Sequence, residues 1–186
     1  TRLSPLEIRS LLLGVFKAED EPDGLFPNRM TPRLSSFYTY SEAALIRARC
    51  SSGSRLRFRT DSPRLRLLLR TGRQARARHC ADLILDGVFI SSFRAPAQPG
   101  ATLEVTFEQR ERKNRLVEIW LPHVSECWIV TLEIEDRATV APAPPEHPGP
   151  WLAMGDSITQ GMEASSPALT LTALAARSLG LGLLNT

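Results

Sequence analysis

Alternation between apolar and polar residues constrains the fold of this chain more than any other feature. Arg55-Leu56-Arg57-Phe58-Arg59 alternates strictly, a polar turn follows, and the alternation resumes from Arg64 to Arg70. This period of two around a Pro-containing turn predicts a β-hairpin. Asp86-Gly87 between two apolar runs predicts a second hairpin with a two-residue turn. Residues 102–108, 117–121 and 128–134 show further alternation.

Residues 1–140 are therefore predicted to form eight to ten short strands in a β-sandwich of the jelly-roll kind. The apolar run at 11–16 is predicted to be a strand rather than a secretion signal, because no basic segment precedes it. This favours the cytoplasm, although a signal removed upstream would leave the compartment open. With 42% hydrophobic residues and no long uninterrupted apolar stretch, bulk disorder and an ordinary transmembrane protein are both excluded.

The composition changes at residue 141. The run 141–150 holds five of the 14 prolines and is predicted to be a linker between domains. Residues 151–154 are apolar without alternation, which is typical of a strand buried on both faces. Another apolar run begins at Leu181. The region 151–186 therefore has the order strand, loop, helix, strand, which is the opening of a parallel α/β domain.

The helix of that region is predicted to begin at Pro167, with Ser166 as N-cap and Gly180 as its stop. Its apolar face is expected to be made by a set of residues at helical spacing: Ala168, Leu171, Leu174, Ala175 and Leu179.

Gly155-Asp156-Ser157-Ile158-Thr159-Gln160-Gly161 lies between the predicted strand and helix. A serine at such a bend can present an exposed hydroxyl and a backbone N–H to a pocket, which serves nucleophilic attack and anion stabilisation together. Gly155 lets a substrate approach the backbone. Asp156 is expected to fix the loop by accepting hydrogen bonds from nearby amides. A plain helix-capping loop is the structural alternative.

This block resembles the first conserved block of the GDSL/SGNH hydrolases, and residues 166–170 and 174–185 resemble the family's first helix and the start of its second strand. The resemblance implies that Ser157 is the nucleophile, that its N–H contributes to the oxyanion hole, and that acyl esters of carbohydrates or lipids are hydrolysed. Residues 57–63, 85–87 and 117–122 are similar, more loosely, to the jelly-roll domain that precedes the catalytic domain in some carbohydrate esterases.

The family's later glycine, asparagine and Asp-x-x-His have no counterparts in this sequence. A serine without a base is a poor nucleophile at pH 7, so we expect the 186 residues alone to be inactive. His79, His123 and His147 are predicted to be surface or turn residues, because none lies on an element expected beside Ser157. No cofactor is expected, and no metal, because carboxylates and histidines show no ligand spacing.

Arginine dominates the basic residues, since Lys17 and Lys113 are the only lysines. The arginines of 55–59 and 64–70 are predicted to face solvent and to pair in part with glutamates of later strands. The formal charge of only +3, and the lack of aromatic residues among these arginines, argue against a nucleic-acid partner.

The cysteines and tryptophans are expected to have mainly structural roles. Cys50, Cys80 and Cys127 are odd in number and contain no CxxC pair, which favours buried free thiols. Trp128 is predicted to lie in the core. Trp120, which is out of phase with its strand, is the candidate for an exposed or interface ring.

The sequence thus predicts a mainly β chain with a sandwich over 1–140, a linker over 141–150 and the start of a hydrolase domain over 151–186. The predicted function is a serine esterase acting on acyl esters, with acetylated carbohydrate as the favoured substrate and no membrane partner. Two alternatives remain open, a non-catalytic carbohydrate-binding sandwich and a plain interaction module. The acyl group, the alcohol and the oligomeric state are not specified by the sequence.

Overall fold

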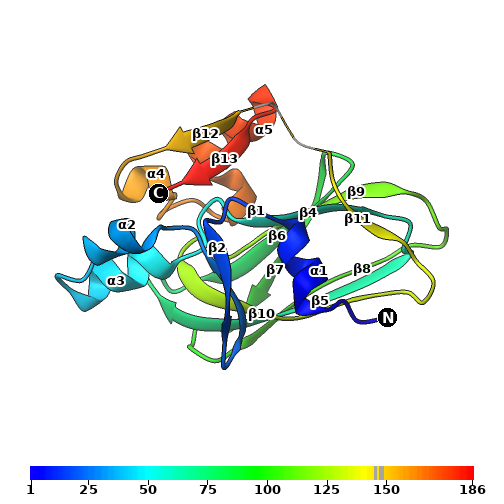
Figure 1. Cartoon of the computed structure of the whole chain (residues 1–186), viewed down its shortest axis with the longest axis horizontal. Coiled ribbons are helices and arrows are strands. Elements are labelled where there is room, and N and C mark those ends of the chain that lie inside the picture. The colour runs from blue at the N-terminus through cyan, green and yellow to red at the C-terminus, as the bar shows by residue number, and fades with distance from the viewer. Residues whose placement is uncertain (145, 147–148) are drawn as a thin grey trace.

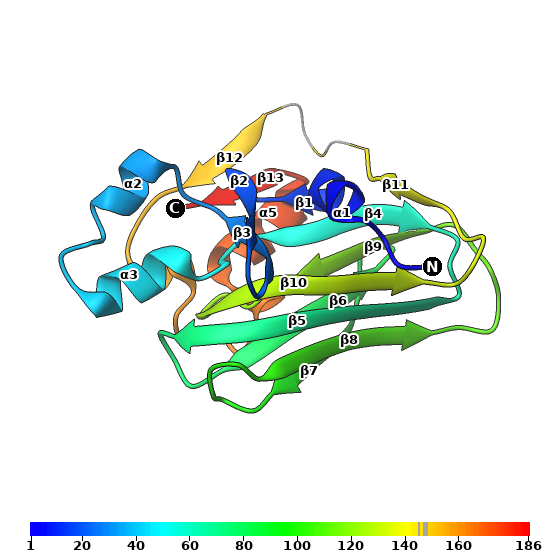
Figure 2. The same ribbon diagram turned by 60° about the horizontal axis from the view of Figure 1, so that its bottom comes forward.

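The computed structural model describes residues 1–144, 146 and 149–186. Two antiparallel sheets make up most of the molecule (Figure 1). The six-stranded sheet runs in the order β1 (Leu12–Leu13), β4 (Arg55–Thr60), β9 (Arg115–Trp120), β6 (His79–Leu85) and β7 (Val88–Ala95), with β11 (Val140–Pro142) also paired to β4. The five-stranded sheet, at the front of Figure 2, runs β2 (Lys17–Glu21), β3 (Gly24–Asn28), β10 (Ser125–Ile134), β5 (Arg64–Gln74) and β8 (Thr102–Glu108).

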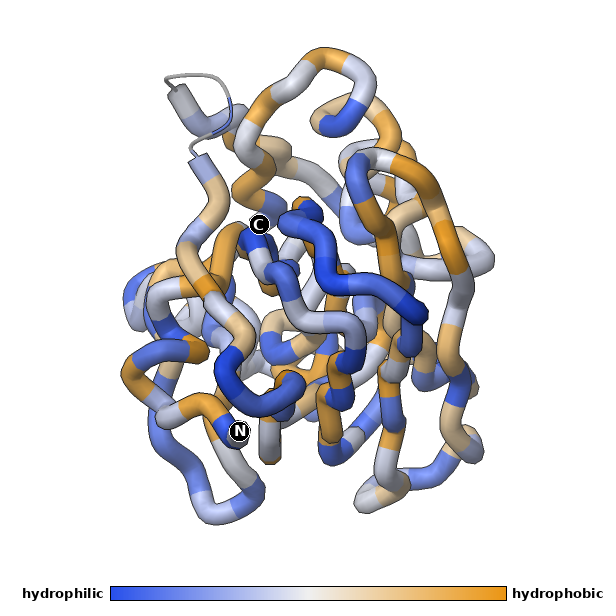
Figure 3. The backbone as a smooth tube through the Cα atoms, turned by 90° about the vertical axis from the view of Figure 1, so that its right-hand side faces the viewer, coloured by the Kyte–Doolittle hydropathy of each residue, from blue (hydrophilic) through white to orange (hydrophobic). Residues whose placement is uncertain are grey.

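One apolar core fills the space between the two sheets. Leu56 and Phe58 from β4 pack there with Leu67 and Leu69 from β5. Hydrophobic and hydrophilic positions alternate along the strands (Figure 3), which confirms the prediction of a mainly β chain. The hairpin at Asp86-Gly87 is also confirmed. Both of its turn residues have positive φ, 49° and 83°, as a type I′ turn requires.

The prediction of strands throughout the first 50 residues is wrong. This region contains three helices: α1 (Pro5–Leu11), α2 (Pro32–Ser36) and α3 (Glu42–Arg49). Each begins at a hydroxyl N-cap, and α1 has a complete capping box between Ser4 and Glu7. Of the apolar run at 11–16, only Leu12–Leu13 forms a strand. Helix α1 therefore ends at the first residue of the predicted strand, of which only two residues pair in a sheet.

The C-terminal region has the predicted order of strand, loop, helix and strand. β12 (Pro150–Ala153) and β13 (Gly182–Asn185) pair in parallel. Between them lie the short helix α4 (Ser157–Gln160), the 3-10 turn η1 (Pro167–Leu169) and α5 (Leu171–Leu179). β12 is not buried on both faces, because Leu152 on its outer face is 50% exposed.

Helix α5 differs from the prediction at its start and in its buried face. The segment from Pro167 forms η1, and α5 begins at Leu171 with Thr170 as N-cap. Ala173 and Ala176 are buried, whereas Leu171 is 67% exposed. Small alanine side chains let the helix approach Trp120 and Leu183 closely. The leucine face predicted to be buried therefore faces outward.

A second apolar cluster joins the C-terminal region to the six-stranded sheet. Trp120 and Ile84 pack there with Ala153, Ala173 and Leu183. Trp120 is fully buried, so the expectation of an exposed ring is wrong and its interface position is confirmed. Trp128 is buried as predicted but lies outside the core between the sheets. Register shifts in β10 change its phase, and its Nε1 donates to Glu21 at 2.8 Å.

The arginines divide into two groups. Arg55 is only 1% exposed, which contradicts the prediction that it faces solvent. Its guanidinium lies 4.6 Å over the ring of Trp120 and bonds to Glu146. Arg64, Arg66 and Arg70 are exposed as predicted. Their shortest ion pairs are with Glu108 at 3.1 Å, Glu104 at 2.7 Å and Asp23 at 3.4 Å, respectively.

The segment predicted to be a linker begins inside a strand, because Ala141 and Pro142 pair with Arg59 and Phe58 of β4. His147 lies outside the described residues. The three cysteines are free and buried, as predicted. In the described part of the chain no helix is long and apolar enough to cross a membrane.

Candidate functional site

The loop between β12 and α4 holds Ser157 in an exposed position. Asp156 is the N-cap of α4, and its Oδ1 accepts from the N–H of Ile158 at 2.9 Å. The cap is thus made by Asp156, which leaves the neighbouring hydroxyl free of that task. Across residues 1–144, 146 and 149–186 no hydrogen bond involves the Ser157 hydroxyl. An exposed, unengaged hydroxyl is what a nucleophile at this bend requires.

Hydrogen bonds from other parts of the molecule anchor this loop. Ser52 donates to the carbonyl of Gln160 at 2.7 Å, and the Asn185 amide donates to the carbonyl of Thr159 at 3.0 Å. The Gln160 amide donates in turn to the carbonyl of Arg47 at 3.3 Å. Ser157 is therefore held by contacts to both the sandwich and β13 rather than by the loop alone.

Both glycines of the motif are sterically required. A Cβ at Gly155 would lie 2.1 Å from Thr159 Oγ1, and a Cβ at Gly161 would lie 2.3 Å from Thr170 Cγ2. Gly161 also ends α4 with a φ of 82°, in the left-handed region. Ser157 is thus presented by a tight turn that larger residues at these two positions would open.

Two hollows flank Ser157. One, of about 350 Å³, is lined by polar and aromatic residues, among them Tyr38, Tyr40 and Arg47. The other, of about 240 Å³, is more apolar and includes Ile158 and Leu171. Ser157 lines both, so a group bonded to its oxygen would have a polar side and an apolar side available.

Sequence reasoning did not identify the polar wall of the first hollow. Tyr38 and Tyr40 lie between α2 and α3, which Figure 1 places beside α4 and the C-terminus. A usable signal was present, because these are the two tyrosines of the whole chain and they are two positions apart. No spacing marks Arg47 or Arg29, which the fold brings to the hollow from separate segments.

Both described histidines are buried, so neither is a surface residue. The prediction of a surface or turn position is wrong for His79, which begins β6, whereas His123 lies in the bend between β9 and β10. His123 lies under the end of the loop, with Cδ2 3.7 Å from the Cβ position of Gly161. Burial lowers its pKa to about 4, and burial also lowers the pKa of His79. Neither lines a hollow beside Ser157. The described residues therefore place no histidine where it could serve as the base.

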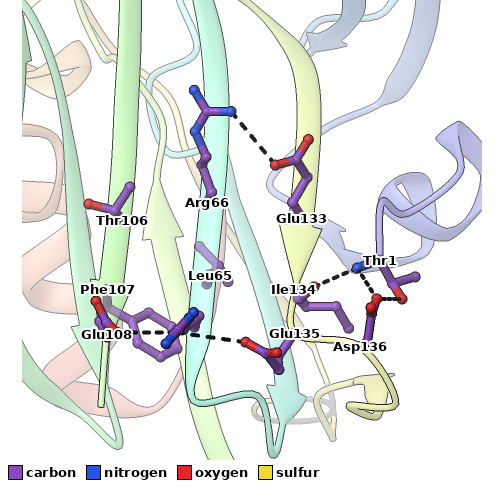
Figure 4. A pocket seen from close by; sticks show the side chains of 11 residues that line it. Thr1, Leu65, Arg66, Thr106, Phe107, Glu108, Glu133, Ile134, Glu135 and Asp136 are labelled. Atoms are coloured by element: carbon purple, nitrogen blue, oxygen red, sulfur yellow. Dashed lines mark hydrogen bonds and ion pairs between the residues drawn. The ribbon is translucent and has the colours of Figure 1, made fainter. Parts of the chain in front are cut away.

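No group of three or more histidine, cysteine or acidic side chains gathers into a metal site in the part of the chain that the structure describes. A wider hollow of about 530 Å³ lies on the outer face of the five-stranded sheet. Figure 4 shows Arg66 and Glu133 pointing toward each other there, 3.7 Å apart, with Phe107 as the one aromatic ring among the lining residues. This surface is occupied by ion pairs and contains no residue of the serine motif.

Comparison with solved structures shows which folds the chain resembles. A salicylyl-acyltransferase from a tetracycline biosynthetic pathway has a TM-score of 0.83 and 28% identity, over 100% of this chain and 54% of the other. A protein described as a GDSL-like lipase from Bacteroides ovatus has a TM-score of 0.74 and 20% identity, over 100% and 55%. A family two carbohydrate esterase from Clostridium thermocellum, solved with cellohexaose, has a TM-score of 0.57 and 18% identity, over 73% and 45%.

The chain therefore has the fold of the corresponding parts of GDSL-like lipases, an acyltransferase and carbohydrate esterases. It spans about half the length of these structures. No protein-family description matches the sequence. No curated protein matches it either.

Proposed function

We propose that this chain is part of a serine esterase of the GDSL/SGNH type, with Ser157 as the nucleophile and acyl esters as substrates. Residues 1–140 are its jelly-roll-like sandwich, 141–150 the connection, and 151–186 the start of the hydrolase domain. The observation that carries the proposal is the exposed hydroxyl of Ser157 at a glycine-flanked turn between two hollows. Acetylated carbohydrate is the proposed substrate class, supported by the carbohydrate esterases of similar fold.

The proposed reaction begins when Ser157 Oγ bonds to the acyl carbonyl carbon and its proton passes to a base. The backbone N–H of Ser157 donates to the resulting oxyanion, because it has no partner among the described residues. The C–O bond to the alcohol then breaks, and the alcohol leaves with a proton. Water attacks the acyl-enzyme in the second step and releases the acid.

The rate at which Ser157 attacks an ester depends on a general base that accepts its proton. Since no described histidine lines either hollow, we expect attack by Ser157 to be slow in the 186 residues alone. Acid–base assistance contributes typically 10²–10⁴-fold, so a loss on the order of 10³-fold is expected relative to a chain that supplies a base. Gly155 and Asp156 act as supports of the loop and of the oxyanion site.

The test is covalent labelling with a fluorophosphonate, followed by intact mass and peptide mapping. Because the described residues supply no base, the label is applied to the longer protein that contains the rest of the hydrolase domain, where we expect one adduct, located on Ser157. Ser157→Ala should abolish the adduct, whereas Ser165→Ala, which removes an exposed serine of the same region, should leave it unchanged. An unlabelled Ser157 in that longer protein, or equal labelling of its Ser157→Ala variant, would reject the proposed role.

A second candidate function is transfer of the acyl group to an alcohol instead of to water. The specific observation in its favour is that the 28%-identical structure is an acyltransferase. Both reactions share the acyl-enzyme at Ser157 and differ only in the acceptor. Product analysis of a labelled ester with and without added alcohol separates them. If Ser157→Ala changed nothing while the chain bound glycans, a carbohydrate-binding module would be indicated instead.

A further inference from the structure

The polar hollow beside Ser157 carries an excess of positive charge. Arg29, Arg47 and Arg76 all line it, and Asp156 is the one acidic side chain among its lining residues. Arg76 is already paired, with its Nε 2.7 Å from Glu163. Arg29 and Arg47 are therefore the two cations of this hollow that have no acidic partner in the described part of the chain.

Arg29 is a buried cation that lines the hollow. Its side chain is buried, and its three nitrogens donate to the carbonyls of Cys50, Asn185 and Arg47 at 2.7–3.0 Å. A buried cation without a carboxylate is costly unless dipoles or a ligand stabilise it. Because it is buried and each of its three nitrogens already donates to a backbone carbonyl, Arg29 contributes mainly an electrostatic field to the hollow.

Arg47 is placed to make the direct contact. Its neighbour on α3, Arg49, is engaged with Glu126 at 2.7 Å and with Glu21 at 3.0 Å. The Arg47 guanidinium has neither an ion pair nor a hydrogen bond within the described residues, although it lines the hollow that contains Ser157. A guanidinium has five N–H donors in a fixed plane, which match the two oxygens of a carboxylate.

Two tyrosines complete the wall opposite the loop. Tyr40 is 78% exposed and Tyr38 is half-buried, and both line the hollow. A tyrosine offers an apolar ring face and a polar hydroxyl. The combination of two rings with one free guanidinium suits a substrate that bears a carboxylate better than a neutral one of the same size.

We propose that this hollow binds a carboxylate carried by the substrate close to its ester bond, and that Arg47 determines this specificity. The inference rests on the proposed function, since it assigns a substrate class to the Ser157 site. It predicts a preference for acyl esters that bear a negative charge over neutral esters of the same size.

The test compares binding of benzoate and benzamide, which share a ring and differ in charge, by calorimetry at low salt. We expect benzoate to bind about tenfold more tightly than benzamide. This ratio is what one charged hydrogen-bonded contact of ordinary strength contributes. Arg47→Gln should remove that tenfold preference and leave benzamide unchanged. Arg59→Gln, at an exposed arginine of β4, is the matched control and should change neither affinity.

Two further arms keep the outcomes distinct. The chain extended by Gly-Ser after Thr186, a residue that lines the hollow, should show the same preference for benzoate. Fluorophosphonate labelling of Ser157 is measured in parallel on the longer protein that supplies the base. Equal affinities for the two probes, no saturation at millimolar concentrations, or the same loss in Arg59→Gln would overturn the inference. Labelling that persists in those cases leaves the proposed function intact.

Discussion

His123 lies buried beneath the loop that carries Ser157, and its burial has a consequence for pH dependence. Its pKa falls from the usual 6.5 to about 4 in the folded state, because burial disfavours the charged ring. The unfolded chain therefore binds a proton as pH falls through 6.5, while the folded chain does not. Burial of the neutral His123 ring therefore costs no protonation free energy above pH 6.5, and the folded state loses stability as pH falls from 6.5 to 4.

The expected loss across that window is on the order of 3 kcal/mol, at about 1.4 kcal/mol per unit of pKa difference. Urea unfolding midpoints measured from pH 7.5 downward should show it. His123→Gln should flatten the slope, whereas His79→Gln, which removes the other described histidine, should retain most of it. A wild-type midpoint that stays constant between pH 6.5 and 4.5 would contradict this account.

Substitution of Gly161 measures the free-energy cost of steric overlap in the Ser157 loop. Its φ is 82° and its Cβ position lies 2.3 Å from Thr170, whereas Gly100 has the same φ and nothing within 4 Å. Gly100→Ala should cost about 1 kcal/mol, the conformational penalty of a left-handed residue. Gly161→Ala should cost a further 1–3 kcal/mol from overpacking and should slow labelling of Ser157. Equal unfolding free energies for the two variants would show that the loop yields without strain.

The Glu126 carboxylate links helix α3 to the five-stranded sheet. Glu126 accepts from Arg49 at 2.7 Å and from the Arg73 side chain at 2.8 Å, and it also accepts from the Arg73 backbone. Burial alone would raise the Glu126 pKa, but the hydrogen bonds from Arg73 and Arg49 outweigh it and hold the pKa below 4.5. Its contribution to stability is therefore full above pH 4.5 and disappears as pH falls through the folded pKa.

Glu126→Gln should lower stability at pH 7 by about 2–4 kcal/mol, because two arginines lose a buried charged partner. The difference from wild type should shrink below pH 4.5, where the wild-type carboxyl also becomes neutral. Chemical denaturation at pH 7 and pH 4 measures both values. Glu108→Gln, in an exposed pair, is the control and should cost less than about 1 kcal/mol.

At this same scale, some elements could be predicted from the sequence and others could not. Alternation and turn chemistry predict the strands and the hairpin at Asp86-Gly87 correctly, because both depend on local residues. The capping box of Ser4 and Glu7 is also a local signal and marks the start of α1, but the prediction of strands over 1–140 does not use it. The buried face of α5 depends on Trp120 and Leu183, which belong to other elements, so helical spacing alone selects the wrong face.

The candidate site also has one part that could be predicted from the sequence and another that could not. The turn that presents Ser157 is encoded in seven consecutive residues and is located from sequence alone. The hollow above it is assembled from β3–α2, α3 and β13, which only the tertiary structure brings together. The bulges of β10 have a similar effect on Trp128, since each register shift moves later side chains to the opposite face.

At the scale of the whole molecule, a buried charge lies beside the apolar cluster that joins the sandwich to the C-terminal region. Arg55 lies between Trp120 and the carboxylates of Glu118 and Glu146. Burial lowers the pKa of Arg55 and raises that of Glu118, and the opposite charges beside each group act against these shifts. Removal of Arg55 leaves the buried Glu118 without this partner, whereas Glu146 keeps Arg57 at 3.6 Å.

Arg55→Met should therefore destabilise the chain by about 3–5 kcal/mol, the usual effect of breaking a buried ion pair. Adding Glu118→Gln should recover part of that loss, because one stranded charge is then removed. Arg64→Met, which breaks an exposed pair, should cost less than about 1 kcal/mol. Guanidinium unfolding monitored by tryptophan fluorescence compares the three. Similar values for Arg55→Met and Arg64→Met would show that the junction does not depend on this charge.

The inaccessible thiols make the chain a convenient host for site-directed labels. Cys50, Cys80 and Cys127 are buried, and burial raises their pKa values to about 12, 11 and 12, so almost no thiolate is present at neutral pH. A spin label or fluorophore attached through Tyr40→Cys would thus report on the α2–α3 hairpin without any native cysteine being replaced. Motion of that hairpin over the serine could then be followed spectroscopically while a ligand is titrated.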